Sequence, residues 1–304
     1  MKYINIGELE GASRVSLGCM RMRDIDEKGA DAIIDCALEN GINYFDHADI
    51  YGRGKSELLF GSYLKRHAGV RDQMILQTKC AIHDGQYDFS KEHIIKSVDG
   101  SLSRLGIEYL DVLLLHRPDT LMEPEEVAEA FEELHTKGKV RYFGVSNHKP
   151  MQIELLKRYV KQPLHINQLQ FSIPVSNMVA NGLEVNMTSD GAPDRDGSVL
   201  DYSRLNDMTI QAWSPFQMPN WQGCFIDSEK YPKLNEELQV LAEQYGVNKT
   251  TIATAWILHH PANMQVVTGT ASEARLAEIM EADKVHLTRQ EWYRLYLAAG
   301  HILP

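Results

Sequence analysis

The sequence has few cysteines, and none of them stand at the spacing of a metal site or a redox motif. Its 304 residues contain Cys19, Cys36, Cys80 and Cys224, which lie far apart along the chain. No CxxC pair and no zinc-binding pattern can be assembled from them. Isolated thiols of this kind are typical of a reducing compartment, so we expect free thiols in a cytoplasmic protein.

Long hydrophobic segments are also missing. No run of about 18 apolar residues occurs, so no membrane-spanning segment is predicted. The first residues, MKYINIGELEGASRV, lack the apolar stretch of a signal peptide. Positive charge is in deficit, because the formal net charge is −11 and the pI is near 5.5. This balance disfavours nucleic acid or an anionic membrane as a partner.

A third absence concerns the fold. The glycine-rich GxGxxG turn of doubly wound dinucleotide-binding sheets is missing after the first strand-like run, where the sequence reads GCMRMRD. What the chain does contain is eight apolar strand-like runs, each followed by helical periodicity. They are RVSLGCM, INYFDHA, MILQTKC, YLDVLLLHR, VRYFGVSN, LHINQLQFS, TIQAWSPF and MQVVTGT. Eight such units in about 300 residues predict a (β/α)8 TIM barrel, with residues 1–304 as a single domain.

Two segments fall outside this repeat. Residues 3–15 are expected to form a short N-terminal hairpin that closes the bottom of the barrel, and LTRQEWYRLYLAAG is expected to form a C-terminal helix. Several helical segments end in glycine, as in RLG and QYG, where a left-handed residue lets the chain turn back toward a strand. The stretch that follows the sixth strand is less regular.

Polar residues mark the carboxyl ends of successive predicted strands, where barrel enzymes carry their chemistry. Asp46 ends the second strand and Tyr51 follows it, Lys79 ends the third, and His116 ends the fourth. A tyrosine has an ordinary pKa of about 10, which a nearby ammonium lowers by favouring the phenolate. A carboxylate would keep that ammonium charged, and a histidine could bind the substrate oxygen. The set suits hydride addition to an aldehyde or ketone.

Each of these residues has a structural explanation when it is taken alone. Lys79 could be a solvated strand end, Asp46 a capping residue, Tyr51 a packing aromatic and His116 a buried structural histidine. A divalent metal held by Asp46, His47 and His116 is the chemical alternative. We expect no metal, because DHAD lacks the HxH spacing of metal-dependent barrel hydrolases and Lys79 would repel the ion. His47 and Asp49 are assigned to loop structure.

The motifs resemble those of the aldo-keto reductase superfamily. The stretches that carry the resemblance are FDHADIYGRGKSELLFGSYL, QTKCAI, DVLLLHRPDTLMEPEEVAEAFEELHTKGKVRYFGVSN, NQLQFS, QAWSPF and VVTGTASEARLAEI, which span residues 45 to 279. The resemblance implies an NAD(P)H-dependent carbonyl reductase. Tyr51 would be the general acid, tuned by Lys79 and Asp46, and His116 would orient the carbonyl.

The resemblance also implies a cofactor, NADPH with NADH as the alternative, and a cofactor site. The expected cofactor-binding residues are Ser146, Asn147, Gln168, Trp213, Ser214, Pro215, Phe216, Gly269, Thr270, Ala271, Ser272, Arg275 and Glu278. Independently of the resemblance, backbone N–H groups at the start of the helix after Gly269 could bind an anion. Met20, Trp221 and Phe225 are expected to wall the substrate pocket.

The expected partner is therefore a small-molecule carbonyl substrate, and the protein is expected to be a monomer or a weak homo-oligomer. The alternative function is a cofactor-binding regulatory or sensor subunit with little turnover, a role that members of this superfamily also fill.

Overall fold

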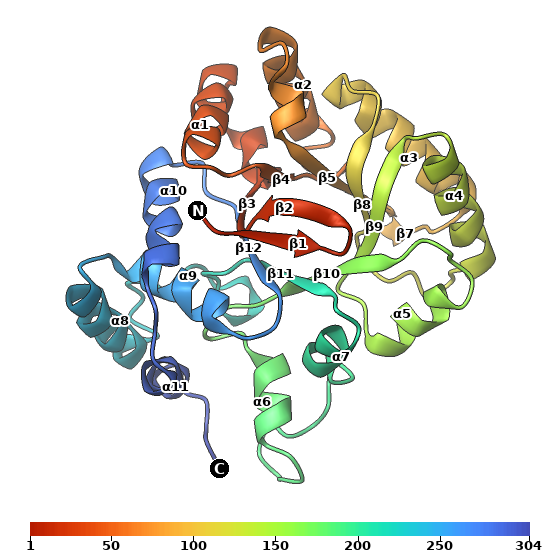
Figure 1. Ribbon diagram of the computed structural model, residues 1–304. Coiled ribbons are helices and arrows are strands. Elements are labelled where there is room, and N and C mark those ends of the chain that lie inside the picture. The colour runs from red at the N-terminus through yellow and green to blue at the C-terminus, as the bar shows by residue number, and fades with distance from the viewer.

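The computed structural model describes residues 1–304 and contains a closed barrel of eight parallel strands, as the sequence predicts (Figure 1). In chain order the barrel strands are β3 (Val15–Gly18), β4 (Tyr44–Asp46), β5 (Ile75–Cys80), β8 (Leu110–Leu115), β9 (Val140–Ser146), β10 (Leu164–Gln170), β11 (Thr209–Trp213) and β12 (Met264–Thr268). Each strand pairs with its neighbour in sequence, and β12 closes the barrel on β3. All eight predicted strands are confirmed.

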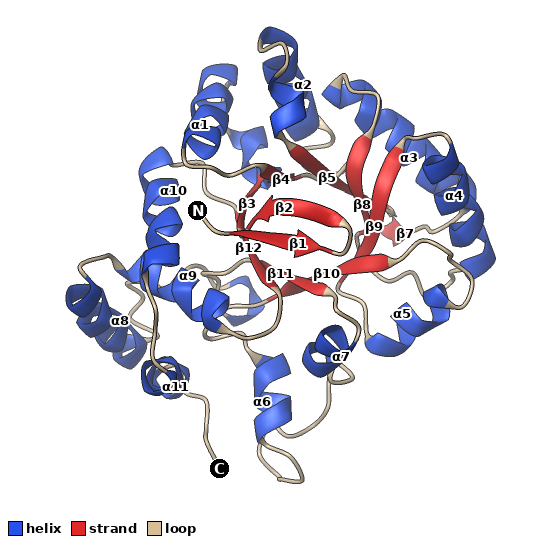
Figure 2. Ribbon diagram, in the orientation of Figure 1, coloured by secondary structure: helices blue, strands red, loops and turns tan.

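Helices surround the barrel on its outer side (Figure 2). They are α1 (Glu27–Glu39), α2 (Lys55–Arg66), α3 (Lys91–Leu105), α4 (Pro124–Thr136), α5 (Pro150–Lys157), α6 (Asn177–Leu183), α7 (Val199–Leu205), α8 (Pro232–Tyr245), α9 (Lys249–His259), α10 (Glu273–Met280) and α11 (Arg289–Ala298). Short 3-10 turns occur at η1 (Cys19–Asp24), η2 (Val70–Gln73), η3 (Pro219–Trp221) and η4 (Glu281–Lys284).

Helix α3 shows how the sequence sets the bounds of these elements. Ser90 caps its start by accepting a hydrogen bond from the His93 amide. Ile94 and Val98 lie on its buried face. Gly106 ends it in the left-handed conformation with φ of +66°, which glycine adopts without steric cost. The chain can therefore turn directly into β8.

The predicted N-terminal hairpin is present as β1 (Tyr3–Ile6) and β2 (Leu9–Ser13), and it lies across the amino end of the barrel (Figure 1). Its Ile6 and Ala12 join a cluster of seven buried residues whose other members are Tyr44, Ile75, Val112, Leu114 and Ile166. Each fully buried aliphatic side chain contributes roughly 1.5–3 kcal/mol. The hairpin is thus an apolar plug for the amino end.

The C-terminal helix is also confirmed, as α11. Its Trp292 stacks on Trp256 of α9 with ring centroids 4.6 Å apart. The indole N–H of each tryptophan donates to the backbone carbonyl of the other, at 3.0 and 2.9 Å. This reciprocal pair fastens α11 to the outer layer.

Three elements were not predicted from the sequence. Helices α6 and α7 lie in the less regular stretch after β10, and each has only seven residues. A small hairpin of β6 (Ile82–His83) and β7 (Gln86–Tyr87) follows β5. These segments are too short for periodicity to define them. None of the helices is both long and apolar enough to cross a membrane.

Candidate active site

The structure brings three of the predicted acid–base residues into direct contact at the carboxyl end of the barrel. The Lys79 ammonium donates to Asp46, with Nζ–O distances of 2.7 and 2.8 Å, and to the Tyr51 hydroxyl at 3.0 Å. Its remaining partner is the backbone carbonyl of His47, at 2.7 Å. Lys79 is the penultimate residue of β5 and Asp46 is the last residue of β4, and these strands are neighbours in the barrel. Strand pairing therefore sets this geometry.

His116 completes the set from the end of β8. Its ring meets that of Tyr51 edge to face, with centroids 6.0 Å apart. Burial, followed by the charges of Lys79 and Arg117, holds the pKa of His116 well below its ordinary value. The imidazole is therefore neutral near pH 7, and one of its nitrogens can donate a hydrogen bond while the other accepts.

Burial dominates the electrostatics of Tyr51. It raises the pKa of the phenol, and the opposing effect of the Lys79 ammonium is too small to reverse the direction. The expectation from sequence of a lowered phenol pKa was therefore wrong for the net shift, although Lys79 does act in the expected sense. Burial also disfavours the Lys79 ammonium, but Asp46 and Tyr51 raise the pKa of Lys79 overall. Tyr51 is thus a protonated phenol beside a permanent cation.

The loop that presents Tyr51 is braced from behind by a buried glutamate. Glu57 of α2 is fully buried; it accepts from the Thr78 hydroxyl at 2.7 Å and forms an ion pair with Arg104 at 2.7 Å. Gly54, with φ of +86°, lies under Arg104, and a Cβ there would come within 2.7 Å of its side chain. The close approach and the positive φ together explain the glycine at position 54.

His47 and Asp49, which the sequence assigns to loop structure, are more deeply placed than a surface loop would be. The His47 side chain is fully buried and packs edge to face on Phe60, with centroids 4.7 Å apart. Burial lowers the pKa of His47 to about 3. Burial and then Glu57 raise the pKa of Asp49 to about 7. The contribution of His47 to the acid–base set is its backbone carbonyl.

A cavity of about 630 Å³ opens at this end of the barrel. Its wall includes fifteen of the residues expected from the sequence: Met20, Asp46, Tyr51, His116, Ser146, Asn147, Gln168, Trp213, Ser214, Pro215, Phe216, Trp221, Gly269, Thr270 and Arg275. They come from the ends of seven of the eight barrel strands and from the segments that follow them, so the barrel topology is what gathers them.

Trp213 presents an aromatic platform within this cavity. Its indole N–H donates to the Asn147 side chain at 3.1 Å, and Asn147 donates to the Ser146 hydroxyl at 2.8 Å. Trp221 stacks on Trp213 with centroids 5.4 Å apart, and the Arg117 guanidinium lies 5.6 Å from the Trp213 ring. Planar rings and cations both pair favourably with an indole face.

Five expected residues do not line the cavity. Lys79 lies behind Tyr51 and is fully buried. Ala271, Ser272 and Glu278 lie outside the wall, where Ser272 caps α10 by accepting from the Arg275 amide. Phe225 is a core residue: it has no exposed surface and belongs to the main hydrophobic cluster, so its placement as a pocket wall does not agree with the structure.

The wall fits an elongated anionic cofactor. Two of its buried atoms, Thr268 Oγ1 and Gln217 Oε1, have no hydrogen-bond partner in the protein. Gly18 approaches the end of β12 so closely that a Cβ would lie 3.2 Å from the Thr268 carbonyl oxygen. Arg275 forms no ion pair and stands near the first turn of α10, where backbone N–H groups favour anions. Cations, unpaired polar atoms and a flat ring are therefore available together.

Two groups of residues at or beneath the cavity wall were not predicted from the sequence. Arg21, Arg23 and Arg117 add positive charge to the cavity. The second group is a set of buried glutamines beneath it, of which only Gln168 was anticipated. A signal for the glutamines was present, because MILQTKC, TIQAWSPF and MQVVTGT each place one glutamine inside an otherwise apolar run. A buried amide must find a partner.

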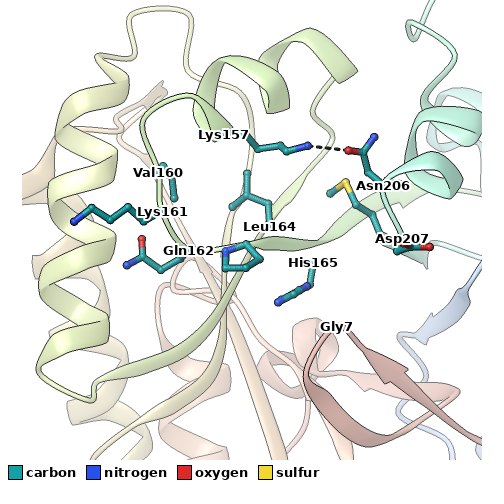
Figure 3. A pocket seen from close by; sticks show the side chains of 11 residues that line it. Gly7, Lys157, Val160, Lys161, Gln162, Leu164, His165, Asn206 and Asp207 are labelled. Carbon is teal, nitrogen blue, oxygen red and sulfur yellow. Dashed lines mark hydrogen bonds between the residues drawn. The ribbon is translucent and has the colours of Figure 1, made fainter.

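Other clusters lack this chemistry. A cavity of about 410 Å³ lies near the amino end, between the β1–β2 hairpin and the starts of β10 and β11 (Figure 3). Lys157 there is already bonded to Asn206 and Glu154. Elsewhere, His83 and His93 lie near Asp88, but their rings stack with centroids 4.2 Å apart. His83 Nε2 already contacts the Asp88 carboxylate at 3.3 Å, and His93 Nε2 contacts the Ser97 hydroxyl at 3.3 Å.

An acid–base set at the carboxyl end of a (β/α)8 barrel is the arrangement of a barrel enzyme. The chain matches the aldo/keto reductase family over residues 14–296, and it belongs to that family of oxidoreductases.

The comparisons with individual proteins agree. The chain is 34% identical to Oxidoreductase YdhF of Escherichia coli (strain K12), with 96% of this chain and 95% of that protein covered. It is 33% identical to a 6-dehydroglucose reductase of Agrobacterium fabrum, covering 98% of each. An aldo-keto reductase of Klebsiella pneumoniae solved in complex with NADPH has a TM-score of 0.79 and 21% identity, covering 97% of this chain and 93% of that one.

Proposed function

We propose that this chain reduces aldehyde or ketone carbonyls to alcohols, with NADPH as the hydride donor and NADH as the alternative donor. The observation that carries the proposal is the Asp46–Lys79–Tyr51 contact at the floor of the cavity, with His116 beside it. The names of the relatives support it, since one is a 6-dehydroglucose reductase and another structure contains NADPH.

Each side chain has a defined part in this reaction. The Tyr51 hydroxyl is the general acid and gives its proton to the carbonyl oxygen, because it is the protonated phenol at the cavity wall. Lys79 stabilises the phenolate that remains, and Asp46 keeps Lys79 charged and in place. The neutral His116 donates to the carbonyl oxygen and stabilises the charge that develops there.

The bound cofactor would supply the hydride. Trp213 would offer the surface for its nicotinamide ring, and Ser146, Asn147 and Gln168, which stand around that platform, would bind the carboxamide. Gly269, Thr270 and Arg275 would meet the adenosine-phosphate end. Pro215, Phe216 and Ser214 would line the path between the two ends, while Met20 and Trp221 would border the substrate.

The test is NADPH oxidation by purified protein with a panel of aldehydes and ketones, together with fluorescence titrations of NADPH and NADH. Turnover with several carbonyls, together with tighter binding of NADPH, is the expected result. Tight NADPH binding with no turnover across the panel would instead favour a sensor subunit, and absence of binding to both cofactors would overturn the proposal.

A further inference from the structure

A row of four glutamines crosses the interior of the barrel directly beneath the acid–base set. They are Gln77 on β5, Gln168 on β10, Gln211 on β11 and Gln265 on β12, and none is more than 3% exposed. Gln168 is the register partner of Gln211, and Gln211 is that of Gln265. Gln77 is the register partner of Asp46. Strand pairing therefore builds this layer.

Two of these amides contact the Asp46 carboxylate. The Gln77 side-chain nitrogen donates to Asp46 Oδ1 at 2.5 Å, and the Gln168 nitrogen donates to the same oxygen at 3.1 Å. Each nitrogen gives its other proton to Gln211 Oε1, at 2.9 Å in both cases. Together with Lys79, Asp46 is surrounded by donors.

The remaining contacts continue the layer across the barrel. The Gln211 nitrogen donates to Gln77 Oε1 at 3.2 Å and to Gln265 Oε1 at 2.8 Å. The Gln265 nitrogen donates to the Ser13 backbone carbonyl at 2.7 Å. The Tyr44 hydroxyl donates to Gln77 Oε1 at 2.7 Å. The layer thus runs from the carboxylate to the N-terminal hairpin.

The chemistry of a carboxylate fixes every amide in this layer. An ionised carboxylate can only accept hydrogen bonds, so Gln77 and Gln168 must both turn their nitrogens toward Asp46. That choice makes Gln211 Oε1 the acceptor for both nitrogens, and the Gln211 nitrogen must then face Gln77 and Gln265. The Gln168 side-chain oxygen, Oε1, accepts no hydrogen bond from the protein, and Gln168 lies at the cavity wall.

We propose that Gln77 and Gln211 are positioning residues of the reductase site. Gln77 holds the Asp46 carboxylate against Lys79, and Gln211 locks the Gln168 amide with its oxygen available to a donor in the cavity. Gln265 completes the layer through Gln211 but is bonded to neither Asp46 nor Gln168. The inference rests on the proposed function for its effect on turnover, whereas its effect on cofactor binding can be measured without turnover.

The physical basis is the charge of Asp46. The titratable groups near this carboxylate are Lys79, Tyr51, Tyr44 and Cys19. Asp46 opposes loss of the Tyr51 proton, while the Gln77 N–H draws part of its negative charge away. Without that donor, Asp46 gains effective charge and freedom to move, and Tyr51 becomes a poorer acid.

The experiment compares Q77L, Q211L and Q265L in the full-length protein, with melting temperature, NADPH affinity and kcat measured for each. Q77L is expected to lower kcat by about 10- to 100-fold with NADPH affinity unchanged. Q211L is expected to lower kcat and also to weaken NADPH binding by about 5- to 10-fold. Q265L, the matched control, leaves buried groups unpaired in the same layer but should change neither by more than about twofold.

A second pair of variants, Q77E and Q265E, tests the inference even if the leucine variants fold poorly. In Q77E, the protonated acid can still donate to Asp46, so turnover should approach that of the wild type at acidic pH. It should fall as pH rises and the new carboxyl loses its proton. In Q265E, kcat should show no such fall as the pH rises.

A purely structural layer would lower the melting temperature in all three leucine variants and leave the kcat and NADPH affinity of folded protein equal among them. That outcome, or identical pH profiles for Q77E and Q265E, would overturn the inference. If the wild type shows no carbonyl turnover, the proposed function fails. The difference in NADPH affinity between Q211L and Q265L would still test the position assigned to Gln168.

Discussion

The two ends of the barrel are built from the same eight strands but have opposite chemistry. The amino end is closed by a hairpin over seven buried, mainly aliphatic residues. The carboxyl end is an open cavity of about 630 Å³ whose floor carries an ion pair and a phenol. The barrel therefore places stabilising apolar contacts at its amino end and reactive side chains at its carboxyl end.

Strand β4 shows that the apolar cluster and the acid–base set lie close together. Tyr44 belongs to the apolar cluster and Asp46 to the acid–base set. Because side chains alternate along a strand, residues two apart point to the same side and lie about 7 Å apart. On β10, Ile166 and Gln168 repeat the same change. One layer of side chains separates the plug from the site.

Phe225 and Trp221 extend the comparison between stabilising and functional residues to the carboxyl end of the barrel. The largest change in stability is expected at Phe225. Phe225 is fully buried, whereas Trp221 is 64% exposed and stacks only on Trp213. F225A should therefore lower the free energy of unfolding by about 3–5 kcal/mol. W221A, from the same loop, should lower it by less than about 1 kcal/mol. Chemical denaturation of both variants would decide, and equal losses would contradict the assignment of Phe225 to the core.

The apolar plug can be weakened without touching the site. Ile6 is 1% exposed in the cluster beneath the barrel, and I6A should cost roughly 2–4 kcal/mol of unfolding free energy. The matched variant I4A, at a partly buried position of the same strand, should cost less. The kcat of folded I6A should stay within about twofold of the wild type. A large fall in kcat would break the separation of the two ends.

His47 gives the smallest effect, and its sign depends on pH. Its pKa is about 3 in the folded protein and near 6.5 when unfolded, so between these values the unfolded chain binds more protons. Stability is therefore lost as pH falls from 6.5 toward 3. H47L removes this loss and should gain about 2 kcal/mol at pH 5 relative to its difference from the wild type at pH 8. Equal differences at both pH values would show that His47 does not titrate in this way.

Asp49 acts in the opposite direction. Its pKa is raised to about 7, so its contribution to stability is complete at low pH and is lost as pH rises toward 7. Because both proteins in the H47L comparison retain Asp49, its effect cancels in the difference between them.

Most of the fold could be predicted from the sequence because strand and helix periodicities are regular. All eight barrel strands, the hairpin and the C-terminal helix follow from apolar patterns and glycine stops. The seven-residue helices α6 and α7 are shorter than the pattern needs to become visible.

Part of the candidate site could be predicted from the sequence for a different reason. Strand ends fix Asp46, Lys79 and His116, so barrel topology alone brings them together. Burial cannot be seen in the sequence. Phe225 was therefore placed on the cavity wall, and the net pKa direction of Tyr51 was missed, because desolvation outweighs a visible charge partner.

The most direct test of the account is the turnover of Y51F, which removes the proton donor and leaves the aromatic ring. With a saturating carbonyl substrate, kcat should fall by about two orders of magnitude or more, because general acid catalysis typically contributes that much. NADPH affinity and melting temperature should remain close to those of the wild type. Near-normal kcat in this variant would contradict the claim that the chemistry resides in the acid–base set at the mouth of the barrel.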